Sequence, residues 1–166
     1  KKFFLTKKNK IKEQFYYNHR GIKCCKLNSD LTDVLIKKIF ELTNPVKLAN
    51  QDFLICAVGG YGRKHLAPYS DIDLLFVYNP KIPEKELKRT IEQILYPLWD
   101  LGMKVGHAVR TFKEVISLSK KEQIIKTSIL DARLILGCNE VFKKIIAQYT
   151  KEFSKKARIF LKEKVD

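Results

Sequence analysis

The sequence has no apolar run long enough to cross a membrane. Its 166 residues contain no stretch near the roughly 18 apolar residues that a membrane-spanning helix requires. The first ten residues, KKFFLTKKNK, lack a long apolar core followed by a small-residue cleavage site, as a secretory signal would have. We therefore expect a cytoplasmic protein with no membrane contact. The hydrophobic content of 45% is sufficient for one folded domain.

Cysteines are few, and their spacing excludes the common metal motifs. The four cysteines, Cys24, Cys25, Cys56 and Cys138, form no C-x-x-C pair. Two adjacent cysteines are also poorly placed to share one metal ion. We expect reduced thiols that are mostly buried.

Arginine is scarce among the basic residues. The chain has 33 lysines and arginines against 18 acidic residues, a net charge of +15, but only six of the basic residues are arginine. Such an excess attracts polyanions. A nucleic-acid site usually gathers its basic residues in one stripe, whereas here the lysines are spread over every segment. Nucleic acid stays open as a partner but is not favoured, and the charge would help a nucleotide triphosphate to arrive.

The pattern of apolar residues predicts helices packed against a small sheet. Short continuous or alternating apolar runs indicate strands, and apolar residues at every third or fourth position indicate helices. Residues 1–22 show neither pattern clearly, so a helix there would depend on packing. The predicted elements, in order, are a helix capped by Asn28–Asp30 and ending near Thr43, strands at 53–58 and 72–78, a helix from Pro83 to Gly102, a strand at 103–110, and helices beyond Thr111, with Gly137 closing one and Asn139 capping the next.

This order of elements predicts the α+β class. We divide the chain into an N-terminal helical segment at 1–50, a core at 51–112 and a C-terminal helical segment at 113–166. The chain does not begin with methionine, and its last residues follow a helical pattern without a stop signal. We therefore expect a piece truncated from a longer protein.

Two aspartates at the start of a buried strand are the strongest sign of chemistry. In PYSDIDLLFV, Asp71 and Asp73 share one face of the strand, while Ile72 takes the other face. Two carboxylates so placed repel each other unless a cation lies between them. Hard ions such as Mg²⁺ bind carboxylate and phosphate oxygens together, and a pair of them can hold both the attacking and the leaving oxygens of a phosphoryl transfer. An isolated Asp-x-Asp is more often a solvated turn, so its surroundings decide.

A glycine-rich loop precedes these aspartates. Gly59 and Gly60 let the backbone approach a ligand closely, and successive N–H groups in such a turn can bind anionic oxygens. Arg63 adds a fixed positive charge, and Ser70 adds a hydroxyl next to the first aspartate. Together with the carboxylates, these residues predict a site for a nucleotide triphosphate.

Four motifs resemble one enzyme family. GGYGR, PYSDIDLLFV, LWDLGMKVGHAVRT and TSILDARLILG are together similar to the amino-terminal nucleotidyltransferase domain of the bacterial bifunctional PII uridylyltransferase/uridylyl-removing enzyme. The first two motifs alone would indicate only the wider DNA polymerase β-like nucleotidyltransferase superfamily. The resemblance covers about residues 53–137.

The resemblance implies a small mixed β-sheet of the polymerase β-like type, followed by a helical segment. It implies Mg²⁺-dependent transfer of UMP from UTP to a tyrosine hydroxyl of the PII signal protein, with release of pyrophosphate. By the family motif, Asp71 and Asp73 would be catalytic metal ligands, Gly59, Gly60 and Ser70 the triphosphate loop, and Arg63 a supporting phosphate contact. The UMP-removing and glutamine-sensing domains of the family are not in this chain.

A third carboxylate, which many members of the superfamily place on the next strand, is not found in MKVGHAVR. His107 or Arg110 could face the site instead, although a histidine on an alternating strand is more often structural. Asp131 could complete the site from a later helix, as could Glu122. The alternative for Asp131 is an ion pair between that helix and the core.

Two other functions compete with protein uridylylation. The same fold could extend RNA or modify a small molecule, which the net charge supports and the last two motifs oppose. The domain could also bind a nucleotide without acting on it when it is separated from its other domains. The choice of base cannot be derived from glycines and carboxylates, which contact only phosphates and metal.

Overall fold

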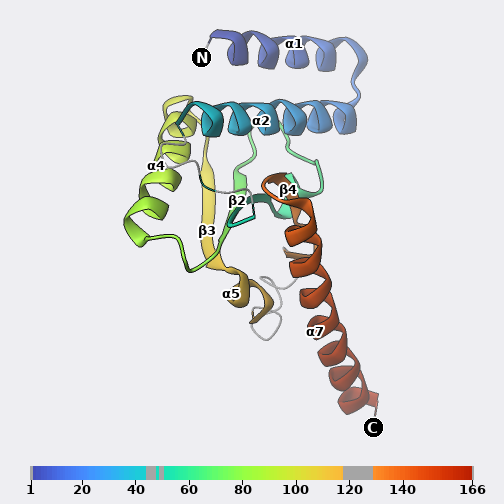
Figure 1. The fold of residues 1–166 in the computed structure, drawn as a ribbon. Coiled ribbons are helices and arrows are strands. Elements are labelled where there is room, and N and C mark those ends of the chain that lie inside the picture. Colours follow the sequence, from blue (N-terminus) through green and yellow to red (C-terminus); the bar gives the residue numbers. More distant parts are fainter. Residues whose placement is uncertain (1, 44–47, 49–50, 118–128, 166) are drawn as a thin grey trace.

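The computed structural model describes residues 2–43, 48, 51–117 and 129–165 of the chain. Figure 1 shows the arrangement of its helices and strands. In chain order they are α1 (Lys2–Asn18), α2 (Gly21–Thr43), β1 (Phe53–Ala57), α3 (Gly59–Gly62), β2 (Ile72–Tyr78), α4 (Glu84–Asp100), β3 (Val105–Thr111), α5 (Phe112–Ser117), β4 (Arg133–Leu136) and α7 (Asn139–Val165).

The four strands form one mixed sheet in the order β3-β2-β1-β4. β1 is antiparallel to both of its neighbours, β2 and β4, whereas β2 and β3 are parallel. A parallel pair needs a long crossover connection, and α4 provides it. The predicted α+β class and small mixed sheet are confirmed.

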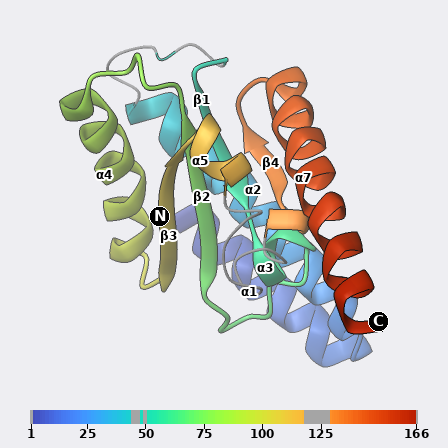
Figure 2. The same cartoon turned by 90° about the horizontal axis from the view of Figure 1, so that it is seen from below.

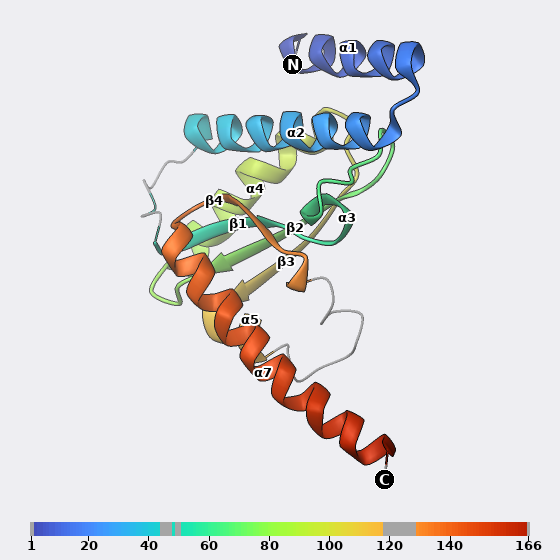
Figure 3. The same ribbon diagram turned by 90° about the vertical axis from the view of Figure 1, so that its right-hand side faces the viewer.

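Helices cover both faces of this sheet because successive strand side chains point to opposite sides. On one face, apolar residues of α2 and α4 pack on Ile55 and Phe76. On the other face, residues of α5 and α7 pack on Leu54 and Leu75. Figure 2 shows α4 and α7 on opposite sides of the strands. α1 lies against α2 on the side away from the sheet (Figures 1 and 3).

The predicted strands and the helix after Pro83 are confirmed. β1 is buried throughout, as a continuous apolar run predicts for a central strand. α4 buries the apolar positions spaced at helical intervals, and Gly102 follows it with a φ of +73°, the left-handed conformation typical of a helix end. The buried apolar residues of α4 are Leu87, Ile91, Ile94, Leu95 and Leu98.

The predicted helix cap at Asn28–Asp30 is wrong, because α2 begins earlier, at Gly21, and runs through these residues. The helix satisfies their polar groups itself: the Ser29 hydroxyl donates to the Cys25 carbonyl at 2.9 Å, and the Thr32 hydroxyl donates to the Asn28 carbonyl at 2.8 Å. Asn28 and Ser29 are also buried in tertiary packing. Polar residues that are favoured at caps are here part of a buried helix face.

The expectation of helices alone beyond Thr111 is also wrong. Residues 133–136 form β4, which pairs with β1 at the edge of the sheet. Gly137 therefore ends a strand rather than a helix. Its φ is +119°, and a Cβ at this position would lie 2.4 Å from the Leu54 side chain and 2.9 Å from the Phe53 carbonyl oxygen. The helix that follows begins at Asn139, within one residue of its predicted cap.

None of the helices in the described part of the chain is both long enough and apolar enough to span a bilayer. All four cysteines are free, and Cys24 and Cys56 are buried. Burial raises the pKa of the Cys56 thiol to about 12, so this thiol stays protonated at neutral pH.

Candidate active site

The chain leaves β1 through a single tight turn, α3, which contains the predicted glycine loop. Gly59 has a φ of +57°, a conformation that favours glycine. Gly62 has no room for a side chain, because a Cβ there would lie 2.2 Å from the Asp131 carbonyl oxygen and 3.0 Å from that of Ala57. These two glycines thus let the turn fit between β1 and the segment that enters β4.

The two predicted metal-binding aspartates lie beside this turn. The Val58 amide donates to the Asp73 carbonyl at 3.1 Å, which joins the end of β1 to the start of β2. The Asp73 carboxylate lies against two glycines: a Cβ on Gly59 would be 3.3 Å from its Oδ2, and a Cβ on Gly106 would be 2.8 Å from its Oδ1. Gly106 is the residue of β3 that pairs with Asp73. The carboxylate therefore occupies space that side chains at these two positions would fill.

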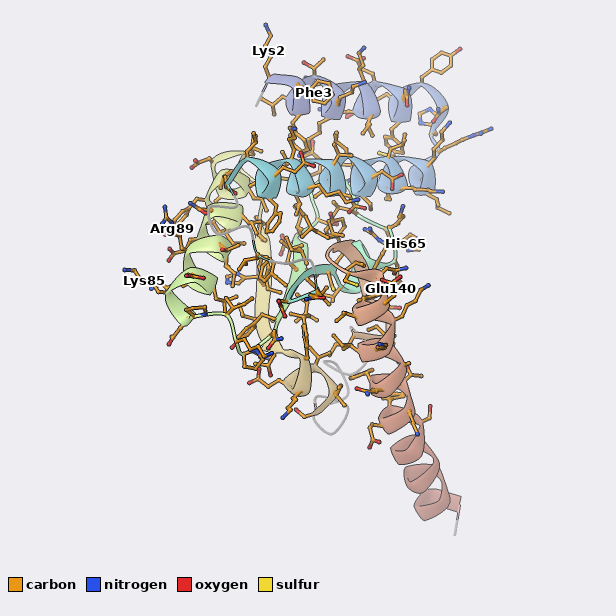
Figure 4. All side chains as sticks on the ribbon, viewed as in Figure 1. Lys2, Phe3, His65, Lys85, Arg89 and Glu140 are labelled. Atoms are coloured by element: carbon orange, nitrogen blue, oxygen red, sulfur yellow. The ribbon has the colours of Figure 1, made fainter. Side chains whose placement is uncertain are left out.

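A pocket of about 400 Å³ opens over this corner of the sheet, and most of its lining is polar. It brings together the glycine turn, the loop after it and the start of β2. In Figure 4, His65 lies below α2, in the segment that follows α3. The lining residues are Gly60, Tyr61, His65, Leu66, Tyr69, Ser70, Asp71 and Asp73.

No basic side chain among the described residues forms an ion pair with these carboxylates. Burial, and secondly the negative charge of Asp71, raise the pKa of the Asp73 carboxyl above its usual value. Within the described ranges, neither aspartate takes part in an ion pair or a side-chain hydrogen bond. Two mutually repelling carboxylates without a cationic partner are the donor set that a hard divalent ion such as Mg²⁺ prefers.

Of the other predicted ligand contacts, Ser70 lines the pocket next to Asp71, and Gly60 lines it from the turn. Arg63 follows the turn immediately, but its guanidinium forms an ion pair with Asp131. Its side chain is 50% exposed. The structure thus brings Gly59, Gly60, Ser70 and the two aspartates together. The Arg63 guanidinium instead pairs with the Asp131 carboxylate.

Among the described residues, no candidate named for completing the site forms a metal-binding group with the pair. Asp131 is in the turn before β4 and pairs with Arg63, so the ion-pair alternative is the one observed, although not from a helix. His107 packs against Phe76 and Trp99 on the α4 side of the sheet. Arg110 shares the Asp73 face but pairs in register four residues farther along, opposite Val77. Glu122 lies outside the described residues.

Within the described residues, no group of three or more His, Cys, Asp and Glu side chains could hold a metal ion. The position on β3 next to Asp73 is Gly106, where a side chain would collide with the carboxylate. Among the described residues, the carboxylates of the site are therefore those of Asp71, just before β2, and Asp73, within it.

Sequence reasoning missed a polar network behind the turn. Asp33 on α2 accepts a hydrogen bond from the Tyr61 hydroxyl at 2.6 Å and two from Arg133, at 2.6 and 3.0 Å. Arg133, the first residue of β4, also donates to the Gly62 carbonyl at 3.2 Å and the Tyr61 carbonyl at 3.4 Å. The sequence contained one indication of this network: Tyr61 and Arg133 fall in two of the family-like motifs, GGYGR and TSILDARLILG.

Burial and charge fix the protonation of this network. Burial, followed by the charge and hydrogen bond of Asp33, raises the pKa of the Tyr61 hydroxyl far above its usual value, so the hydroxyl remains a donor. Burial lowers the pKa of Arg133, but the hydrogen bonds and charge of Asp33 outweigh it and the net shift is upward. The network therefore consists of an ion pair with a neutral tyrosine bonded to it.

Comparison with known proteins shows the family of this chain. The profile of the nucleotidyltransferase domain family matches residues 36–161, so the chain belongs to this family. It is also similar to three bifunctional uridylyltransferase/uridylyl-removing enzymes: 40% identical over 152 residues to that of Phenylobacterium zucineum, 39% over 152 residues to that of Caulobacter vibrioides, and 36% over 148 residues to that of Azospirillum brasilense. These matches cover 86–87% of this chain but only 16% of each relative.

A solved toxin–antitoxin structure with AMP-PNP has a lower similarity. It shares 12% sequence identity, covers 81% of this chain and 98% of that chain, and gives a TM-score of 0.47. A likeness of this size carries no argument about the activity of this chain.

Proposed function

We propose that this domain transfers UMP from UTP to a tyrosine hydroxyl of the PII signal protein and releases pyrophosphate. The observation that carries the proposal is the pair of unneutralised carboxylates, Asp71 and Asp73, beside a glycine turn in an open polar pocket. The identity of 36–40% to uridylyltransferase/uridylyl-removing enzymes supports UTP as the donor.

Asp71 and Asp73 would hold Mg²⁺ through their carboxylate oxygens. Bound there, Mg²⁺ would offset charge on the phosphate oxygens and lower the pKa of the attacking hydroxyl. The two carboxylates fit this role because they lie on one face of a strand whose other face is buried in the core. Ile72, between them, is 2% exposed and anchors the strand.

The rest of the pocket would position the nucleotide. Gly59 and Gly60 leave the backbone of the turn open to the triphosphate, and the Ser70 hydroxyl lies beside Asp71 in the same pocket. Arg63 would support the phosphates from the rim, by exchanging Asp131 for a phosphate oxygen. The contribution of these residues is mainly positioning and electrostatics, as is usual in phosphoryl transfer.

The test is transfer of labelled nucleotide from each of the four triphosphates in the presence of Mg²⁺, with PII protein as acceptor. We expect label to move only from UTP and only to a tyrosine of PII. Asp73→Asn serves as the inactive control. Transfer from another triphosphate, or no transfer to PII under conditions where the domain is folded and binds UTP, would contradict the proposal.

A specific observation favours offering RNA as a second acceptor in the same assay. α1 carries five lysines and a single acidic residue, Glu13, and Phe3 and Tyr16 on it are 67% and 63% exposed. Lys2 extends from this helix into solvent (Figure 4). Exposed lysines with aromatic neighbours can bind single-stranded nucleic acid. Label on RNA rather than on PII would establish the alternative function.

A further inference from the structure

We propose that Asp33, Tyr61 and Arg133 are positioning residues that hold the glycine turn in the shape that binds triphosphate. This inference rests on the proposed function, because it assumes that the turn is part of a nucleotide site. The three residues come from α2, α3 and β4, and are far apart in the sequence. Their hydrogen bonds therefore join α2, α3 and β4 at the end of the turn.

All three guanidinium nitrogens of Arg133 donate hydrogen bonds. Two of its nitrogens, Nη1 and Nη2, donate to the Asp33 carboxylate, and Nε and Nη2 also reach the carbonyl oxygens of Gly62 and Tyr61. The guanidinium carbon lies 5.4 Å from the centre of the Tyr61 ring. A planar guanidinium with this many fixed contacts is rigid, and lysine could not reproduce them.

The network contacts the end of the turn, and its Tyr61 also lines the pocket. Arg133 takes the carbonyl oxygens at the end of α3, while Gly60 and Asp73 face the pocket. The Tyr61 side chain is 1% exposed, and the side chains of Arg133 and Asp33 are 23% and 13% exposed. A network this shielded from water keeps one geometry, so the turn it holds is fixed before any ligand arrives.

The neighbouring ion pair, Lys64–Asp30, is more exposed to water than the Arg133–Asp33 pair and does not contact the backbone of the turn. It also joins α2 to the segment after the turn, at 2.6 Å, but its side chains are 36% and 44% exposed. Its hydrogen bond runs between two side chains and reaches no backbone atom of the turn. Asp30 and Asp33 lie one helical turn apart on α2, so each aspartate-to-asparagine change removes the same charge from almost the same place.

This pair of aspartates provides a matched test. Binding of inorganic tripolyphosphate with Mg²⁺ is measured for the wild-type chain, Asp33→Asn and Asp30→Asn, because this probe carries no base. We expect Asp33→Asn to weaken binding about tenfold and Asp30→Asn to change it less than about twofold. Loss of a negative charge would by itself strengthen binding of an anion, so weakening reports on the shape of the turn rather than on charge.

Hydrogen exchange at the amides of Gly62 and Arg63, which donate to the Val58 and Gly59 carbonyls at 3.0 and 3.2 Å, provides a second measurement. Exchange in Asp33→Asn should be about tenfold faster than in Asp30→Asn, because the turn opens more often. Tyr61→Phe keeps the ring and removes one hydrogen bond to Asp33, so it should have the same effects at a smaller size and provides the test if Asp33→Asn does not fold. Melting temperatures verify that each variant is folded.

The outcomes separate this inference from the proposed function. Equal affinities and equal exchange rates in Asp33→Asn and Asp30→Asn would overturn the positioning role, even if the wild-type chain transfers UMP. Conversely, a chain that binds tripolyphosphate with the expected difference between variants but transfers no UMP would overturn the proposed function and leave the positioning role standing.

Discussion

Two sets of acidic side chains lie near the same glycine turn, and they differ in the groups that neutralise their charge. Asp33 is bound by a guanidinium and a tyrosine hydroxyl. Asp71 and Asp73 line the pocket, and in the part of the chain that the structure describes no basic side chain forms an ion pair with either of them. The first arrangement stabilises the fold, whereas in the second the charge of Asp71 acts on Asp73.

The ionised carboxylate of Asp73 lowers the stability of the fold. A carboxylate whose pKa is raised by burial and by a like charge is less stable when ionised than it would be in water. Strain of this kind is common where a site is preorganised for a ligand. Asp33, with its partners already in place, contributes rigidity to the same turn.

Removing one of the pocket carboxylates should have the largest effect. Asp71→Asn should lower UMP transfer at least about 10³-fold, because metal-assisted charge stabilisation contributes several kcal/mol to the transition state. The fold should persist, since asparagine has the same shape and no partner is lost. Rates and circular dichroism spectra would be compared with wild type. A double variant, Asp71→Asn with Asp73→Asn, that still transferred nucleotide would exclude the mechanism.

Moving a carboxylate without removing it should have an intermediate effect. In Gly106→Ala the new Cβ would lie 2.8 Å from the Asp73 Oδ1, so the carboxylate must shift. The backbone need not move, because the obstructing atom is the end of a side chain. We expect transfer to fall about 10²-fold with little change in stability.

The control for this variant is Gly21→Ala, at the start of α2 and outside the pocket lining, where the new Cβ would be 4.0 Å from Phe15. It should leave the transfer rate unchanged. Equal rates in Gly106→Ala and wild type would show that the position of the Asp73 carboxylate does not limit the reaction.

The smallest effect concerns stability and pH in the absence of metal. The pKa of Asp73 is higher in the folded chain than in the unfolded chain, so the folded state holds this proton more tightly. Stability from this group is therefore present at low pH and falls as the pH rises through the folded pKa. The effect should be small because burial of this side chain is only partial, and water still screens its charge.

Asp73→Asn removes this dependence. With a chelator present, the variant should melt at a higher temperature relative to wild type at pH 7 than at pH 4. Mg²⁺ should reduce the difference at pH 7, because it stabilises only the wild-type carboxylate. A melting-temperature difference that is the same at both pH values would contradict the unneutralised state of the pair.

Much of the candidate site was predictable because its residues are close in the sequence. Gly59, Gly60, Ser70, Asp71 and Asp73 all lie within the fifteen residues from 59 to 73, where one strand, one turn and the next strand bring them together. The alternation of strand side chains was enough to place both aspartates on one face. The buried strands and α4 were predicted for a similar reason, since their apolar spacing is a local property.

Contacts between distant residues could not be predicted. Arg133 reaches Asp33 across 100 positions of sequence, and no local pattern indicates that pairing. β4 has four residues, and its strand conformation depends on antiparallel pairing with β1, which is distant in the sequence. Likewise, the sequence predicted a phosphate contact for Arg63 but could not show that its guanidinium pairs with Asp131.

The sequence by itself determined three local features of this domain: which carboxylates lie together, which glycines form the turn beside them, and which apolar runs form the central strands. These features follow from periodicity and steric size within short segments. Only the tertiary structure decided which charges are neutralised. Neutralisation depends on which groups meet in space: Asp33 contacts Arg133, whereas Asp73 lies near the charge of Asp71.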